Sequence, residues 1–205
     1  MSDTNFVFKN LGQQDYSEVW ESMKDFTAQR DSKTKDEIWF VQHPPVYTLG
    51  LNGKNTHILN TSDIPVINID RGGQVTYHGP GQLVVYCMIN LQQRGYGVQA
   101  FVKRLQQSIQ DLLLEYEIPS HLIEKAPGVY TNGKKIAALG LRVKRHCTYH
   151  GLSLNIDMDL APFKNINPCG YPDLEVSQLS DFAVTDKMEQ IIEKFKSILE
   201  NNIYS

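Results

Sequence analysis

Three cysteines are the candidate nucleophiles of this chain of 205 residues, and their sequence contexts differ. Cys169 lies in the string INPCGYPD, where a tight turn can present the sulfur and aim backbone N–H groups at an oxyanion. Cys87 lies inside an apolar run, which predicts a small buried thiol. Cys147 follows the charged string RVKRH, which we expect to face water. Cys169 therefore has the best context for a nucleophile.

A cysteine nucleophile needs a cationic or basic partner, because a free thiol has a pKa of about 8.5 and is mostly protonated near neutral pH. Lys135, in the string KKIAALG, lies just inside a strand that soon becomes apolar, and it is the candidate partner. Taken alone, its position favours a solvated lysine beside a hairpin turn. Only the fold can bring Lys135 next to Cys169.

The tetrapeptide TYHG occurs twice, at residues 76–79 and 148–151. A single histidine is more often a surface or core residue than a catalytic one. Two copies of one string in strand-rich surroundings instead predict that His78 and His150 lie near one cavity. The chain has only six histidines and no HExxH pattern, so we predict no metal site.

The segment RGGQVTYHGPGQLVVY, residues 71–86, is rich in glycine. Its spacing is neither GxGxxG nor GxxxxGK[ST], which excludes dinucleotide and P-loop motifs. It lies between two predicted strands and opens no helix, so phosphate binding at a helix N-terminus is not indicated. Two interpretations stay open: a long turn, or a wall on which a ligand lies flat beside polar side chains such as Arg71 and Gln74.

Hydrophobic periodicity predicts the elements that position these residues. Helical spacing indicates helices over residues 16–30, 98–116 and 187–199. Strands are predicted over residues 37–42, 46–50, 65–70 and 82–91. Residues 128–157 read as an antiparallel meander, with the hairpin signal Asn132-Gly133 between its first two strands. The predicted fold is α/β, with a mixed, largely antiparallel sheet flanked by helices.

Composition narrows the class of protein. The chain is 41% hydrophobic and 21% charged with a formal net charge of −3, which gives no support for a nucleic-acid binder. Its length suits a single domain over residues 1–205. We expect no secretory signal and no membrane span, because no apolar run approaches about 18 residues. An odd number of widely spaced cysteines favours reduced thiols and the cytoplasm.

Four strings in order resemble the lipoyl(octanoyl)-protein transferases of lipoate biosynthesis, a family related to the lipoate and biotin protein ligases. They are HPPVYTLG, RGGQVTYHGPGQLVVY, KKIAALGLRV with HGLSLN after it, and NPCGY. The match covers roughly residues 40–175. The resemblance implies the catalytic-domain fold that these transferases share with the ligases.

The resemblance also implies an activity, its donor and acceptors, and the residues that carry it out. An octanoyl group would pass from octanoyl-acyl carrier protein, through a cysteine thioester, to a specific lysine of a lipoyl domain, without a cofactor. The implied acceptors are the lipoyl domains of 2-oxoacid dehydrogenase complexes and the glycine cleavage H protein. By matching position, Cys169 would be the nucleophile and Lys135 its partner, while His150 would support the wall of the acyl pocket. That wall would comprise Arg71, Gly72, Gly73, Gln74, Val75, Thr76, Tyr77, His78, Ala138, Leu139, Gly140, Gly151, Leu152 and Ser153, its glycines leaving room for an eight-carbon chain.

Two alternatives belong to other classes. An ATP-dependent lipoate ligase would activate a free acid as an adenylate and would need no cysteine nucleophile, so NPCGY argues against it. An inactive relative would only bind lipoyl domains or carrier proteins, and the presence of both Cys169 and Lys135 argues against that.

Overall fold

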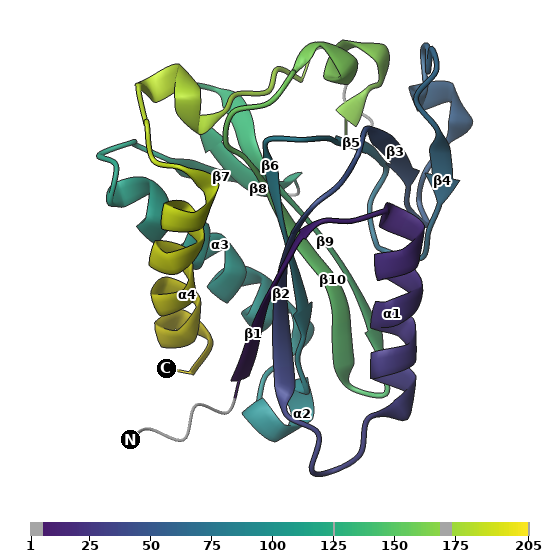
Figure 1. Cartoon of the computed structure of the whole chain (residues 1–205), viewed down its shortest axis with the longest axis vertical. Coiled ribbons are helices and arrows are strands. Elements are labelled where there is room, and N and C mark those ends of the chain that lie inside the picture. The colour runs from purple at the N-terminus through teal and green to yellow at the C-terminus, as the bar shows by residue number, and fades with distance from the viewer. Residues whose placement is uncertain (1–5, 125, 169–173, 205) are drawn as a thin grey trace.

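The computed structural model of the chain describes residues 6–124, 126–168 and 174–204. Its largest element is a seven-stranded sheet with the strand order β1-β2-β6-β10-β9-β8-β7 (Figure 1). β1 and β2 pair in parallel, and every other neighbouring pair is antiparallel. The predicted mixed, largely antiparallel sheet is confirmed. The strands are β1 (Phe6–Gln13), β2 (Asp36–Gln42), β6 (Gln82–Met88), β7 (His121–Ile123), β8 (Ala126–Thr131), β9 (Lys134–Lys144) and β10 (Cys147–Asn155).

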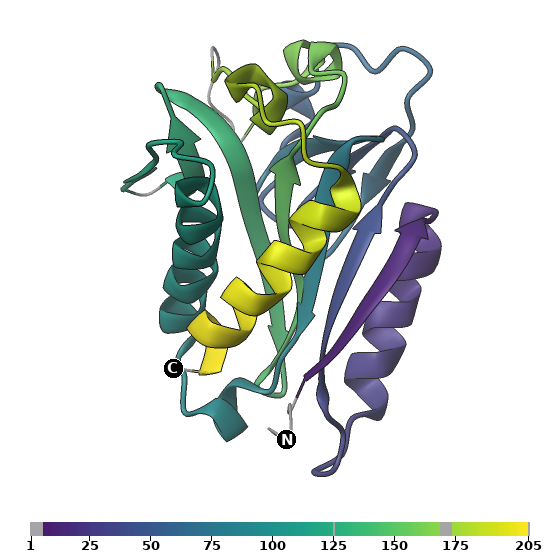
Figure 2. The ribbon, with the colours of Figure 1, turned by 60° about the vertical axis from the view of Figure 1, so that its left-hand side comes forward.

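Helices cover both faces of this sheet. α3 and α4 lie side by side on one face, and α1 lies on the other (Figures 1 and 2). The three long helices confirm the predicted periodic segments, although α4 extends five residues further than the pattern indicated. The helices are α1 (Tyr16–Gln29), α2 (Leu91–Arg94), α3 (Val98–Leu114) and α4 (Met188–Tyr204), with the short 3-10 helices η1 (Asn55–His57), η2 (Ala161–Asn165) and η4 (Leu179–Phe182).

The apolar run of β6 shows why the sheet needs helices on both sides. Successive side chains of a strand point to opposite faces. Leu83 and Val85 belong to the core beneath α3 and α4, whereas Val84 and Tyr86 belong to the core beneath α1. A strand buried on both faces reads as a continuous apolar run, as predicted for this segment.

A second, three-stranded sheet has the order β4-β3-β5. Its strands are β3 (Val46–Leu49), β4 (Val66–Asn68) and β5 (Val75–His78). β5 lies inside the glycine-rich segment, so the interpretation of that whole segment as one long turn is wrong. Val75, Thr76 and Tyr77 suit a strand and pair with β3. Gly73 and Gly81, with φ of 95° and 84°, provide the turns on either side.

Two tight turns set the register of the central meander. Asn132 and Gly133 join β8 to β9 with φ of 48° and 76°, which confirms the predicted hairpin. Arg145 and His146 join β9 to β10 with φ of 51° and 64°. Positive φ at both central residues matches the right-handed twist of the flanking strands.

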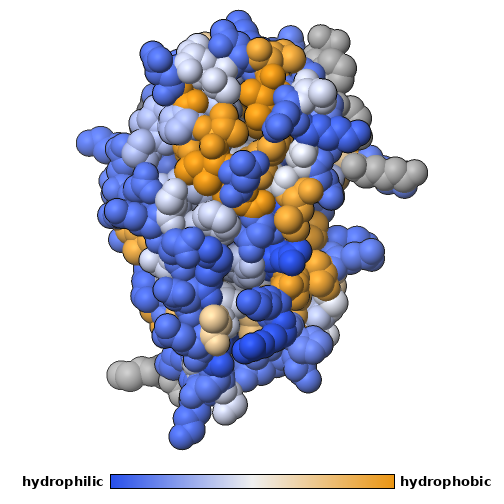
Figure 3. All heavy atoms as spheres, turned by 90° about the vertical axis from the view of Figure 1, so that its right-hand side faces the viewer, coloured by the Kyte–Doolittle hydropathy of each residue, from blue (hydrophilic) through white to orange (hydrophobic). Residues whose placement is uncertain are grey.

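One face of the molecule carries an apolar area. Figure 3 shows the side that bears α1 and the three-stranded sheet, with apolar side chains gathered over its upper part. None of the helices in the described part of the chain has the length and apolar character needed to cross a membrane.

Candidate active site

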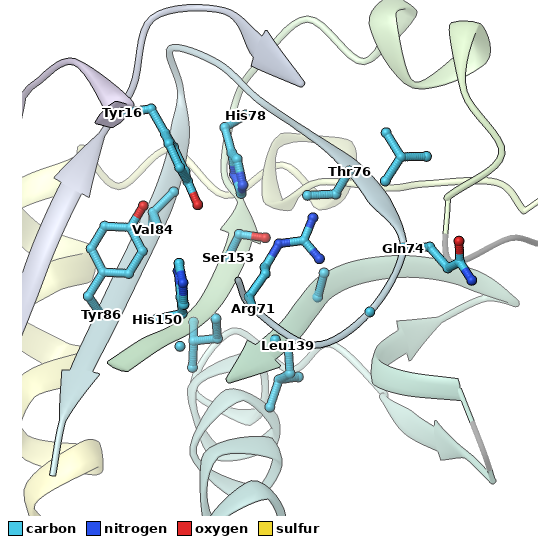
Figure 4. A pocket seen from close by; sticks show the side chains of 16 residues that line it. Tyr16, Arg71, Gln74, Thr76, His78, Val84, Tyr86, Leu139, His150 and Ser153 are labelled. Carbon is cyan, nitrogen blue, oxygen red and sulfur yellow. The ribbon is translucent and has the colours of Figure 1, made fainter. Parts of the chain in front are cut away.

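A cavity lies where β5, β6, β9, β10 and the start of α1 meet (Figure 4). Twelve of the fourteen residues predicted for the wall line it, together with His150. Three lining residues, Tyr16, Val84 and Tyr86, were not predicted. The predicted lining residues are Arg71, Gly73, Gln74, Val75, Thr76, His78, Ala138, Leu139, Gly140, Gly151, Leu152 and Ser153.

The two remaining wall candidates lie elsewhere. The ring of Tyr77 packs at 5.5 Å from the rings of Tyr47 and Phe163, in the core of the small sheet. Gly72 donates its backbone N–H to the carbonyl of Leu141 at 3.0 Å, which ties the turn before β5 to β9. Both residues support the wall from outside the cavity.

Arg71 is buried and fastens the turn before β5 to β3. Its guanidinium donates to the carbonyl of Gly72 at 3.0 Å, and to the carbonyl and hydroxyl oxygens of Thr48 at 2.8 Å each. A Cβ at Gly140 would lie 3.0 Å from Cδ of Arg71. A Cβ at Gly151 would lie 2.0 Å from the Val85 carbonyl oxygen of β6. Gly140 therefore makes room for the side chain of Arg71, and Gly151 makes room for the backbone of β6. This differs from the expectation that the wall glycines make room for an acyl chain.

The structure brings the imidazoles of both TYHG strings to this one cavity, as the repeat predicts. Nδ1 of His78 lies 2.6 Å from Oε1 of Gln82, whose amide nitrogen donates to Asn155 and to the Tyr77 carbonyl. Because that amide orientation makes Oε1 an acceptor, Nδ1 of His78 carries the proton. Burial lowers the pKa of His78 to about 3, so the ring is neutral at pH 7.

His150 is held by Asp70, which was not predicted. Nε2 of His150 lies 3.0 Å from Oδ1 of Asp70, and the same carboxylate accepts from Trp20 at 2.9 Å and from the Tyr149 hydroxyl. Burial opposes ionisation of Asp70, but the three hydrogen bonds outweigh it and hold its pKa below the usual value. Burial lowers the pKa of His150, and the bond to Asp70 only partly offsets this. A neutral imidazole therefore faces an ionised carboxylate.

A chain of hydrogen bonds runs behind the cavity through His43, Tyr86 and Tyr16. Nδ1 of His43 donates to the Gln14 carbonyl at 2.8 Å, so Nε2 accepts from the Tyr86 hydroxyl at 2.8 Å. The hydroxyls of Tyr86 and Tyr16 also interact with each other. Burial lowers the pKa of His43 to about 4 and raises that of Tyr16 to about 12, so these groups are neutral at pH 7. Because these residues lie far apart in the sequence, their spacing does not indicate that they are linked.

Lys135 is buried, so the interpretation as a solvated hairpin lysine is wrong. Its Nζ donates to the carbonyl of Pro127 at 3.2 Å and lies 5.2 Å from the ring centre of Tyr130. A Cβ at Gly128 would lie 2.9 Å from Cε of Lys135, so that glycine makes room for the lysine side chain. The side chain of Lys135, two residues after the hairpin turn, is thereby directed inward.

Lys135 lines a second cavity that adjoins the first. Thr76, Ala138 and Ser153 line both cavities, and Pro168 joins Lys135 in the second one. The two spaces therefore share a wall.

The backbone of Lys135 also holds the segment after residue 173. Its N–H donates to the carbonyl of Glu175 at 2.9 Å, and its carbonyl accepts from the N–H of Ser177 at 3.0 Å. Residues after 173 thus pair with the backbone of Lys135, and Pro168, before residue 169, lines the same cavity as Lys135.

Residues 15–200 match the family described as the lipoyl protein ligase A/B catalytic domain. The chain belongs to this lipoyl protein ligase A/B family. Its relatives include the octanoyltransferase of Shewanella sp. (strain W3-18-1), 51% identical over 97% of this chain and 94% of the relative. The octanoyltransferase of Vesicomyosocius okutanii is 53% identical over 95% of this chain and 96% of the relative. The chain is accordingly an acyltransferase.

Solved structures with low sequence identity to this chain share its fold. A bi-partite lipoate protein ligase from Thermoplasma acidophilum, studied with its E2 lipoyl domain, aligns with a TM-score of 0.73 at 12% identity, covering 96% of this chain and 83% of that one. A lipoate-protein ligase A bound with ATP aligns with a TM-score of 0.76 at 11% identity, covering 97% and 85%. These similarities confirm the predicted lipoate ligase catalytic-domain fold.

Within this family's fold, the two described cysteines are poor candidates for a nucleophile. Burial raises the pKa of Cys87 to about 12 and also raises the pKa of Cys147. The charged string before Cys147 is largely exposed, as expected, but Cys147 itself is only 6% exposed: it opens the central strand β10 and bridges Asn90. Cys169 lies outside the described residues. Among the described residues, no group of three or more His, Cys, Asp or Glu could hold a metal ion.

Proposed function

We propose that the protein transfers an octanoyl group from octanoyl-acyl carrier protein to a specific lysine of a lipoyl domain, through a thioester on Cys169. The observation that carries this proposal is the burial of Lys135 in a cavity whose wall includes Pro168, the residue directly before Cys169. The adjoining cavity continues between β6, β9 and β10, with Val84, Leu139 and Leu152 on its walls. A buried lysine beside an apolar space suits a fatty acyl thioester.

The proposed first step exchanges one thioester for another. The ammonium of Lys135 favours the thiolate of Cys169, which attacks the carbonyl carbon of the acyl thioester. A carbon–sulfur bond to Cys169 forms as the bond to the carrier breaks. The carrier thiolate leaves and takes a proton from Lys135, so no cofactor is needed.

The proposed second step forms the amide. The amine of the acceptor lysine attacks the thioester carbon, and the neutral amine of Lys135 takes the proton that the attacking nitrogen loses. The carbon–nitrogen bond forms, the bond to Cys169 breaks, and the thiolate and ammonium are restored.

The proposal also covers the acceptor proteins and the cellular location. One structural neighbour is a ligase studied with an E2 lipoyl domain. We propose that lipoyl domains of 2-oxoacid dehydrogenase complexes and the glycine cleavage H protein are the acceptors here. The free thiols of Cys87 and Cys147 suit the cytoplasm as the place of action.

Intact-mass analysis after incubation with octanoyl-acyl carrier protein tests the proposal. We expect a single octanoyl adduct on the wild-type protein and on Cys147→Ala, and none on Cys169→Ala. Adding a lipoyl domain should discharge the adduct. A wild-type protein that forms no adduct, and labels the lipoyl domain only from free octanoate and ATP, would contradict the proposal in favour of a ligase.

A further inference from the structure

The end of the cavity at His150 is polar, and the rest of the lining mixes the apolar Val84, Leu139 and Leu152 with polar groups of Arg71, His78 and Ser153. Tyr16, Tyr86 and His150 lie together at one side of the cavity, and Gln74 and Thr76 lie at the opposite side (Figure 4). The rings of Tyr86 and His150 have centres 6.3 Å apart. A hydrocarbon chain has no hydrogen bond to offer such an end, so another function must account for its polarity.

His150 is fixed in one tautomer and one position. The ionised carboxylate of Asp70 accepts from Nε2, so Nε2 carries the proton and Nδ1 has a lone pair. The backbone of His150 has a φ of 60°, an uncommon conformation within a strand, in which histidine and asparagine are enriched. As a result its ring stacks on that of Tyr149, 5.1 Å away at 27°, although neighbouring residues of a strand usually face opposite sides.

Nδ1 of His150 is buried and has no hydrogen-bond partner among the residues that the structure describes. His150 is 1% exposed, and nearly all such buried polar atoms are paired with protein or with ordered water. The cavity that His150 lines is the route by which water can reach it. The hydroxyl of Tyr16, which lines the same cavity, offers a second hydrogen-bonding group.

We propose that His150 binds one water molecule at the inner end of the cavity and thereby sets the longest acyl chain that the enzyme accepts. This inference rests on the proposed acyl transfer. Ser153, at the cavity that holds Lys135, is three residues from His150 along β10, which is about 10 Å in a strand. An extended eight-carbon chain spans about 9 Å, at about 1.25 Å for each carbon–carbon bond.

An octanoyl chain that starts beside Ser153 therefore ends just short of His150. A decanoyl chain would extend about 2.5 Å further and displace the water. An apolar methyl group cannot replace the hydrogen bond that the water gives to Nδ1, so the longer chain leaves a buried acceptor unpaired.

Two variants of His150 show whether the hydrogen bond at Nδ1 or the steric space at this position limits the length of the acyl chain. In His150→Gln the amide can still reach Asp70, but no polar atom occupies the place of Nδ1. In His150→Asn a polar atom occupies that place, the bond to Asp70 is lost, and the backbone conformation is one that asparagine adopts readily. The measurement is the rate of adduct formation with octanoyl- and decanoyl-acyl carrier protein, followed by intact mass, with thermal unfolding as the check on folding.

We expect His150→Gln to raise the decanoyl-to-octanoyl rate ratio about tenfold, and His150→Asn to keep it within about twofold of wild type. If space alone set the limit, the shorter asparagine would raise the ratio more than glutamine, and that order would overturn the inference. An unchanged ratio in His150→Gln would also overturn it. A wild-type protein that forms no octanoyl adduct would instead overturn the proposed function.

A measurement on the wild-type protein makes the test independent of how the variants fold. The 15N resonance of His150 Nδ1 reports whether this atom accepts a hydrogen bond. We expect the 15N chemical shift of a hydrogen-bonded Nδ1 in the free and the octanoylated protein. In the decanoylated protein it should move toward the chemical shift of an Nδ1 without a hydrogen bond. The same resonance in both acylated forms would overturn the inference.

Discussion

Lys135 is the residue whose environment differs most from what its local sequence indicates. It follows an exposed turn, yet its side chain is buried over Gly128 and beside Tyr130. Its neighbour Lys134 is 46% exposed and pairs with Glu175 at 2.8 Å. The two adjacent lysines therefore form a matched pair, one inside the site and one on the surface.

Replacing Lys135 should slow acylation without preventing folding. We expect Lys135→Met to reduce the rate of adduct formation from octanoyl-acyl carrier protein about 100-fold and to shift its pH profile upward, because the thiolate loses its cation. Lys134→Met should stay within about twofold of wild type. Stopped-flow or quenched-flow mass analysis across pH makes the comparison. An unshifted profile for Lys135→Met would refute the role of Lys135 in favouring the thiolate.

Buried neutral histidines should make stability depend on pH. Burial lowers the pKa of His43 to about 4, below the unfolded value of about 6.5. The unfolded state therefore binds a proton that the folded state does not, and stability falls as pH decreases from 6.5 toward 4. We expect His43→Gln to flatten this dependence by about 1.4 kcal/mol per pH unit. Chemical denaturation at pH 7, 6 and 5 measures it, and equal slopes in the two proteins would contradict the account.

At the scale of the elements, β10 carries much of the site because it lies between β6 and β9. Its close approach to β6 depends on Gly151, where a Cβ would lie 2.0 Å from the Val85 carbonyl oxygen. We expect Gly151→Ala to lower the free energy of unfolding by about 3 kcal/mol or more, since strands must separate to relieve the overlap.

Gly97→Ala is the control for that change. Gly97 precedes α3 and has a φ of −83°, and a Cβ added there would have no heavy atom within 4 Å. Its replacement should change the free energy of unfolding by less than about 1 kcal/mol. Equal effects of the two substitutions in urea denaturation would show that the contact with β6 is unimportant.

At the scale of the whole molecule, a buried charge cluster joins segments that are distant in sequence. Asp36 of β2 pairs with Arg30 at 2.5 Å and with Arg94 at 2.8 Å, and accepts from the N–H of Asn90 at 2.8 Å. Arg94 also donates to Tyr204 of α4 at 2.7 Å. The cluster connects the end of α1, the large sheet, α2 and the last helix.

Removing the central charge of this cluster should destabilise the fold strongly. Asp36→Asn leaves the buried guanidinium of Arg30 and the partly buried one of Arg94 without their carboxylate, and we expect a loss of about 3–5 kcal/mol. Glu193→Gln, which breaks an exposed ion pair with Lys196 on α4, should have little effect. Thermal and urea denaturation compare the two variants, and a small effect for Asp36→Asn would contradict the structural role of the cluster.

Local patterns predicted much of this fold. The apolar run of β6, the periodicity of α3 and the Asn132-Gly133 turn each follow from near neighbours in the chain, and the structure confirms them. β5 was missed because glycines flank a strand of only four residues, which depends on pairing with β3.

The site was predictable only where its residues fall in motifs. The TYHG strings pointed to His78 and His150, but the partners that fix these rings do not adjoin them in a pattern. Asp70 reaches His150 only through the packing of the two sheets, and the chain of His43, Tyr86 and Tyr16 joins three separate elements. Local sequence also could not show that the side chain of Lys135 points inward, because this depends on the space that Gly128 leaves across the hairpin.

The most direct test of the central claim is to locate the acyl group after wild-type protein has been incubated with octanoyl-acyl carrier protein alone and quenched in acid. Peptide mapping should find one octanoyl group, as a hydroxylamine-labile thioester, on the peptide that contains Cys169. Peptides with Cys87 and Cys147 should be unmodified. An octanoyl group on either of those cysteines, or acylation that requires ATP, would contradict the account.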